Sequence, residues 1–120
     1  MSFYQSALDI AAESRDAPDS IPARTSAILS ALDGLGRRLS ATRFLDKDFS
    51  LAQAEAQAKQ TNRSAKLFGV PLAHKELYGR VAPSGPWPDE GGSSTCEGQP
   101  ARQTAFAISQ LDKAGSIDCG

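Results

Sequence analysis

The sequence reads GVPLAHK over residues 69–75, an apolar stretch that leads directly into a lysine. Val70 to Ala73 is the strand candidate, because Pro71 near the start of a strand is more tolerable than at its centre. A lysine that closes a buried strand is costly, since burial disfavours its charged form. Such a lysine makes chemical sense where a neutral amine must accept a proton. From these residues alone Lys75 is most simply an exposed lysine after a strand, and the alternative is a catalytic base that works as a neutral amine.

The residues that follow predict a second strand joined to the first through a helix. Residues 78–97 contain four glycines and three prolines among short polar runs, and this composition predicts a loop. A helix is expected over Ala101–Ala114, with Pro100 at its first position and Gly115 as a left-handed C-cap. Ile117–Cys119 is the next expected strand. This order resembles part of a βαβ crossover and indicates an α/β fold.

The N-terminal half is predicted to be mostly helical. Apolar residues recur at helical spacing in two stretches, and Ser50 with Gln53 reads as a capping box that opens a third helix. Two prolines among short polar residues indicate a linker between the first two helices. The expected segments are a helix over 3–13, a linker over 15–22, a helix over 25–35, a short extended piece over 43–45 and a helix over 51–61. The chain then divides into a mostly helical segment, residues 1–66, and the start of an α/β core, residues 67–120.

Residues 69–76, GVPLAHKE, resemble the Gly-Ile-Pro-x-x-x-Lys-Asp signature of the amidase signature family. A Gly/Ser/Thr-rich stretch follows at residues 91–98, GGSSTCEG. Residues 101–120, ARQTAFAISQLDKAGSIDCG, are similar to the family's Asp-Ala-x-x-Val-x-x-Leu-x-x-Ala-Gly-Ala-Ile-x-x-Gly region. The resemblance covers residues 67–120 well and residues 44–66 loosely. Each piece is weak alone, and their order and spacing make the resemblance fairly specific.

This resemblance implies a serine hydrolase that acts on small-molecule carboxamides without a cofactor or a metal. Members of the family use a Ser–cis-Ser–Lys triad, and Lys75 matches the lysine. Both serines would follow Gly120, so we expect the chain to be the N-terminal part of an amidase, inactive alone, with the first strands and crossover helix of an incomplete mixed sheet. Backbone N–H groups in a glycine-rich turn would hold the oxyanion.

Three positions depart from the family pattern. Glu76 stands where the family usually has aspartate, which keeps the charge but changes its reach. Residues 95–98, TCEG, lack a serine after the glycine. Residues 100–102, PAR, replace the aspartate that usually opens the helix. These differences put the loop geometry in doubt more than Lys75.

Other candidate site residues are each weighed against a structural role. His74 is the only histidine and has no cysteine motif beside it, which argues against a metal site and favours a structural role. Alternation along the strand points it away from Lys75. Trp87 is either a wall of the substrate pocket or an anchor for its loop. Ser93, Ser94 and Thr95 form a polar loop without a nucleophile elbow. The thiol of Cys96 lies beside Glu97, which does not favour a reactive thiolate.

Composition excludes several classes of protein. The net charge is −1 with no block of like charges, so nothing indicates a nucleic-acid surface. The sequence contains no run of 18 apolar residues, so no membrane-spanning helix is predicted. Asp9 and Glu13 stand where an export signal would be apolar, so none is expected. The two cysteines, Cys96 and Cys119, are expected to be reduced thiols in a cytoplasmic protein.

Two further functions stay open at the level of sequence. The alanine-rich helix and the incomplete catalytic set suit a non-catalytic helical interaction module. The same signature also occurs in amidotransferases that release ammonia from glutamine, which would require a partner subunit. The sequence leaves the identity of the amide and the oligomeric state open.

Overall fold

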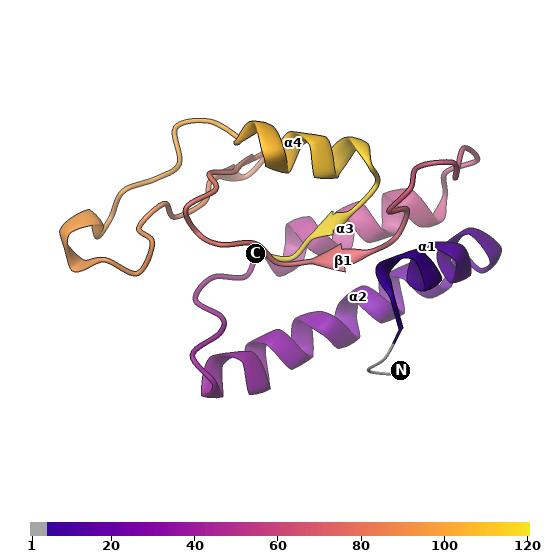
Figure 1. The fold of residues 1–120 in the computed structure, drawn as a ribbon, viewed down its shortest axis with the longest axis horizontal. Coiled ribbons are helices and arrows are strands. Elements are labelled where there is room, and N and C mark those ends of the chain that lie inside the picture. The colour runs from indigo at the N-terminus through magenta and orange to yellow at the C-terminus, as the bar shows by residue number, and fades with distance from the viewer. Residues whose placement is uncertain (1–4) are drawn as a thin grey trace.

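The structure, a computed structural model, describes residues 5–120 as a mixed fold of helices and short strands (Figure 1). Helix α2 packs against α3, α3 packs against β4, and α2 also contacts β1. The elements are α1 (Ala7–Asp16), α2 (Ser20–Ala31), the π-helical turn η1 (Leu32–Gly36), α3 (Lys47–Ala58), β1 (Pro71–Leu72), β2 (Val81–Ala82), β3 (Gly85–Pro86), the 3₁₀ turn η2 (Ser94–Cys96), α4 (Phe106–Lys113) and β4 (Ile117–Asp118).

The first helix ends three residues later than predicted and the second begins five residues earlier, so the linker between them is shorter. Helix α1 begins at a capping box formed by Ser6 and Asp9 and continues to Asp16. The start of the predicted helix, residues 3 and 4, lies outside the described residues. The predicted linker over 15–22 is wrong at both ends, because α1 continues to Asp16 and α2 already begins at Ser20. Pro22 fits the first turn of α2, where its missing N–H would have had no helical partner.

Helix α3 begins four residues before the predicted start, so the capping box at Ser50 is wrong. Asp46 is the N-cap, and its Oδ1 accepts a hydrogen bond of 3.1 Å from the backbone N–H of Phe49. Ser50 lies inside the helix and is fully buried. Its Oγ is 2.6 Å from the carbonyl oxygen of Asp46 and 2.9 Å from that of Asp118. The serine therefore connects α3 to β4.

The two predicted strands are confirmed and form a short parallel pair. Pro71 of β1 is opposite Ile117 of β4, and Leu72 is opposite Asp118. Helix α4 connects them, as the βαβ pattern predicts, but it begins at Phe106 and Pro100 lies outside it. The predicted left-handed residue after α4 is confirmed at Gly115, whose φ is +93°.

The segment predicted as loop contains a small antiparallel hairpin. Val81 pairs with Pro86 and Ala82 with Gly85 across a two-residue turn. A further isolated bridge joins Pro88 to Pro100. The prediction of loop throughout residues 78–97 is therefore wrong for β2 and β3, because the turn between them permits pairing that composition alone does not reveal.

Side chains of α3 bind the backbone of β4 along the edge that faces away from β1. The backbone N–H groups of Ile117 and Cys119 face β1, whereas the backbone of Asp118 faces α3. The Asp118 N–H donates to Oε1 of Gln53 at 3.0 Å, and Ser50 binds its carbonyl oxygen. Unpaired strand edges expose donors and acceptors that need partners, and here α3 supplies them.

The apolar core lies where α2, α3 and β4 meet. Its fully buried members are Ile21, Ala54, Phe68 and Ile117, with Ala65 against them. These residues come from both halves of the chain, so the helical segment and the strand segment share one core. The tight approach of the chain at Gly115 adjoins this core, since a Cβ there would lie 2.9 Å from the Cβ of Ala65.

Candidate active site

The candidate site lies at the carboxyl ends of β1 and β4. Strands β1 and β4 run parallel, so the polypeptide leaves both strands at the same end of the sheet. There the backbone N–H of His74 donates to the carbonyl oxygen of Gly120 at 2.9 Å. Lys75 follows immediately, and its carbonyl oxygen accepts from the N–H of Tyr78 in a turn. In open α/β sheets, the carboxyl ends of the strands are where ligands usually bind.

A pocket of about 370 Å³ opens at this edge, within the size range of small-molecule sites. Four chain segments form it: the strap of residues 40–45 between η1 and α3, the turn after β1, the chain that follows β3, and Gly120 after β4. Its lining residues are Ser40, Ala41, Thr42, Arg43, Phe44, Leu45, Ala73, His74, Lys75, Glu76, Tyr78, Trp87, Pro88 and Gly120.

Lys75 lines this pocket, but its side chain is exposed to solvent. Within residues 5–120 the ammonium group has neither a hydrogen bond nor an ion pair. The burial expected for this lysine is therefore not found in residues 5–120. The catalytic role of Lys75 stays a prediction.

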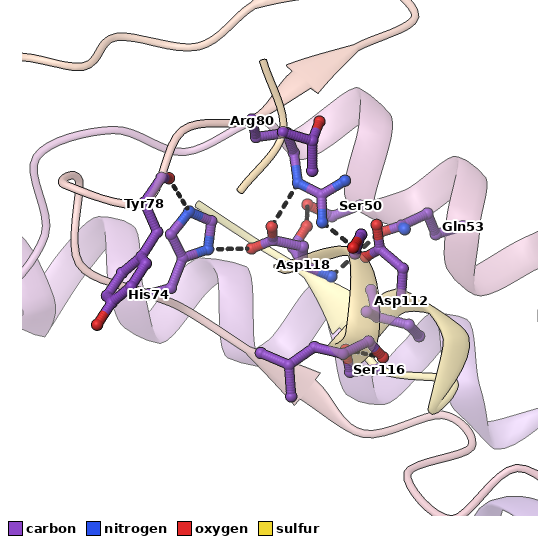
Figure 2. Close-up of polar contacts among 12 residues, drawn as sticks. Ser50, Gln53, His74, Tyr78, Arg80, Asp112, Ser116 and Asp118 are labelled. Atoms are coloured by element: carbon purple, nitrogen blue, oxygen red, sulfur yellow. Dashed lines mark hydrogen bonds and ion pairs between the residues drawn. The ribbon is translucent and has the colours of Figure 1, made fainter. Parts of the chain in front are cut away.

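A buried ionic network includes His74 of the pocket lining (Figure 2). Asp118, whose side chain is 1% exposed, accepts from Nδ1 of His74 at 3.0 Å and from Nε of Arg80 at 2.5 Å. The second arm of Arg80 contacts Asp112 of α4 at 2.6 Å. Burial alone would lower the pKa of Arg80, but the hydrogen bonds and charges of the two carboxylates outweigh it and raise that pKa above its ordinary value.

The ring of His74 is held at both nitrogens. Nδ1 faces Asp118, and Nε2 faces the carbonyl oxygen of Tyr78 at 3.0 Å. Both neighbours are acceptors, so a doubly protonated ring satisfies both contacts and a neutral ring satisfies one. The ring also stacks on Trp87, with centroids 5.8 Å apart. These contacts give His74 the structural role expected from the sequence: it fixes the turn that carries Lys75.

Trp87 anchors its loop, as one of the two interpretations from sequence expects, and it also lines the pocket. Its side chain is buried, and its Nε1 donates to Oδ2 of Asp46 at 2.8 Å. Phe44 and Phe49 pack against the ring at centroid distances of 5.3 and 5.7 Å. The guanidinium of Arg80 lies 5.3 Å from the ring centroid, within the range of a cation–π contact.

Ion pairs tie the strap to the turn and to the glycine-rich loop. Arg43 contacts Glu76 at 3.4 Å and Glu90 at 2.9 Å. Glu76 also accepts from the backbone N–H of Gly92 at 3.2 Å. The acidic residue after the lysine therefore holds the loops at the pocket mouth. The polar residues of that loop, Ser93, Ser94 and Thr95, are exposed and do not line the pocket.

Sequence reasoning did not single out Arg80, Asp112 or Asp118 as site residues. One signal was available, because Asp118 interrupts the apolar strand Ile117–Cys119. A charged residue in a strand expected to be buried needs a partner of opposite charge. No comparable signal marks Arg80, which follows the turn after Lys75 and lies 38 residues before Asp118.

Searches against protein-family models and against curated proteins found no match to this chain. In the part of the chain that the structure describes, no group of histidine, cysteine and acidic side chains has the arrangement of a metal site. None of the helices in residues 5–120 has both the length and the apolar character needed to cross a membrane.

The two thiols are expected to differ in reactivity. Burial, together with the charge of Asp118, raises the pKa of Cys119 to about 11, whereas Cys96 is half-buried in the loop. At pH 8 we expect a thiol reagent to label Cys96 readily and Cys119 only after unfolding. Mass spectrometry with and without urea measures this, and a Cys96→Ser chain should take up no label while folded. Rapid labelling of Cys119 in that variant would contradict the buried position.

The same thiol makes stability depend on pH. The ordinary pKa of 9.0 applies to the unfolded chain, so the unfolded thiol loses its proton above pH 9 while the folded thiol keeps it until about pH 11. The unfolded state therefore binds fewer protons in this window, and the stability of the fold decreases as the pH rises from 9 to 11.

Proposed function

We propose that this chain carries the lysine base of a serine-dependent amidase. The observation that carries the proposal is the position of Lys75 on the pocket wall, at the edge where β1 and β4 end together. The likeness of residues 69–76 and 101–120 to the amidase signature family supports it independently. Together they connect a chemically suitable side chain with a space for a small molecule.

In the proposed reaction, a serine hydroxyl attacks the carbonyl carbon of the amide. Its proton passes to a second serine hydroxyl, and the proton of that serine passes to the neutral amine of Lys75. The proton then returns to the leaving nitrogen, the C–N bond breaks, and water releases the acyl group as a carboxylic acid. The resemblance to the amidase signature family implies that both serines would follow Gly120.

The contact between His74 and Gly120 supports this arrangement. Because the His74 N–H binds the carbonyl oxygen of Gly120, chain that continues past Gly120 starts beside the turn that carries Lys75. Serines from that continuation need not cross the fold to reach the lysine. The network of His74, Asp118 and Arg80 keeps both strand ends fixed relative to each other.

The test compares two polypeptides in an amide-hydrolysis assay that measures ammonia release. We expect no turnover by residues 1–120, and turnover by a polypeptide that continues through the serine-containing segment. A serine-directed sulfonyl fluoride should inactivate the longer polypeptide and modify one of its serines, as peptide mapping would report. Turnover by the 120-residue chain alone would require a different nucleophile and would overturn the proposal, as would an inactive, correctly folded longer polypeptide.

A non-catalytic interaction module is the second candidate. It is favoured by two exposed leucines, Leu35 and Leu39, which are 57% and 68% exposed near the end of the second helical segment. An interaction surface requires a contiguous exposed apolar patch, and these two leucines, four residues apart, would contribute to one. The absence of turnover by the longer polypeptide, combined with association that Leu35→Ser abolishes, would support this candidate instead.

A further inference from the structure

Four polar side chains of the pocket lining, Arg43, His74, Glu76 and Trp87, are paired with other protein groups, whereas those of Ser40, Thr42, Lys75 and Tyr78 have no such partner within residues 5–120. Arg43 is neutralised by Glu76 and Glu90, and the indole N–H of Trp87 is taken by Asp46. Both nitrogens of His74 are occupied by protein acceptors (Figure 2). A ligand in the pocket therefore meets the apolar faces of these side chains more than their polar ends.

Aromatic rings supply much of this apolar wall. Phe44, Tyr78 and Trp87 all line the pocket, together with the stacked ring of His74. Phe44 and Trp87 are tilted by 58° to each other, so they meet at an angle and do not close the space as a parallel stack would. Aromatic groups favour tilted and edge-on partners of their own kind.

Charge limits what else the pocket accepts. Lys75 is the only charged lining residue without an ion pair or hydrogen bond from its side chain within residues 5–120. The one side-chain carboxylate of the lining, Glu76, is engaged by Arg43 and by the N–H of Gly92. A ligand ammonium would find no free side-chain carboxylate, and desolvating a charge without a partner is unfavourable. Amino-acid amides such as glutamine are therefore poor candidates.

We propose that the pocket takes an uncharged aromatic acyl group, with the carboxamide at Lys75. The substrate class is thus aromatic carboxamides, in preference to small aliphatic amides and amino-acid amides. This inference rests on the proposed function for its chemistry. The predicted binding depends on the pocket alone and not on hydrolysis, since every wall residue named here lies within residues 5–120.

The experiment titrates the 120-residue chain, with the carboxyl group of Gly120 amidated because this residue lines the pocket, with benzamide, cyclohexanecarboxamide, acetamide and glutamine. Trp87 is the only tryptophan, so its indole N–H signal in an NMR spectrum reports directly on the pocket. We expect saturable shifts with benzamide, and binding about tenfold weaker or undetectable for acetamide and glutamine. Equal binding of cyclohexanecarboxamide would remove the aromatic preference, and tighter binding of glutamine would overturn the substrate class.

Variants separate the pocket from the rest of the surface. Phe44→Ala and Tyr78→Ala should each weaken benzamide binding several-fold, and the half-exposed Tyr78 can be replaced without removing a core side chain. Phe106→Ala is the matched control, because Phe106 is 78% exposed and lies outside the pocket lining. Unchanged binding in both pocket variants would overturn the inference.

The two proposals fail in different ways. If the 120-residue chain binds benzamide but the longer polypeptide hydrolyses no amide, the amidase function fails and the aromatic site stands. If the longer polypeptide hydrolyses acetamide or glutamine but not benzamide, the amidase function stands and the substrate class proposed here is wrong.

Discussion

Replacing Lys75 with methionine should reduce kcat/KM of the longer polypeptide for its amide substrate by about a thousandfold or more. A general base contributes roughly 10²- to 10⁴-fold to a rate, and here the same group also returns the proton to the leaving nitrogen. Methionine keeps most of the length of the lysine but cannot accept a proton. Because Lys75 is exposed, the substitution should leave the stability of the fold nearly unchanged.

Two further variants separate the chemistry of Lys75 from its charge. The guanidinium of Lys75→Arg stays protonated, so this variant should be as inactive as Lys75→Met if the neutral amine is required. Lys113→Met removes an exposed lysine at the end of α4, away from the pocket, and should retain activity. Steady-state kinetics measures all three. Activity of Lys75→Met within tenfold of the parent would mean that another group is the base.

The elements that sequence predicted best are those with local signals. The apolar run before Lys75 and the strand after Gly115 both form, because short apolar segments between turn residues favour strands. Gly115 adopts its left-handed conformation after α4, where a glycine is the residue of least steric cost. The family resemblance covers the same region, and the pocket lies at the end of these strands.

The errors arise where long-range contacts override local patterns. Ser50 and Gln53 have the spacing of a capping box, yet both bind the backbone of Asp118, more than 60 residues away. Asp46 is the N-cap, and its carboxylate accepts hydrogen bonds from both the backbone N–H of Phe49 and the indole N–H of Trp87. No local sequence pattern contains these partners. The position of the strap, residues 40–45, along the pocket is likewise not predictable from local sequence, since it follows from the packing of α2 and α3.

The second large effect is expected on stability, from Asp118→Ala. This carboxylate is 1% exposed and neutralises Arg80, which is 4% exposed. Removing it leaves a buried guanidinium with one carboxylate and leaves Nδ1 of His74 without its acceptor. Breaking a buried ion pair by deleting one partner usually costs about 3–5 kcal/mol. Urea denaturation of the 120-residue chain should show a loss of this order.

Asp112→Ala provides the matched control, because Asp112 is the other partner of Arg80 but its side chain is 33% exposed. Water can replace a partly exposed carboxylate, so the expected loss is about 1 kcal/mol. His74 is the only histidine, and its ring signals in an NMR spectrum should move in Asp118→Ala and stay nearly in place in Asp112→Ala. Equal losses of stability in the two variants would mean that Arg80, and not the contact of Asp118 with His74, sustains the network. A loss below about 1 kcal/mol for Asp118→Ala would show that the strand ends hold together without it, and that the turn bearing Lys75 is positioned by its backbone contacts alone.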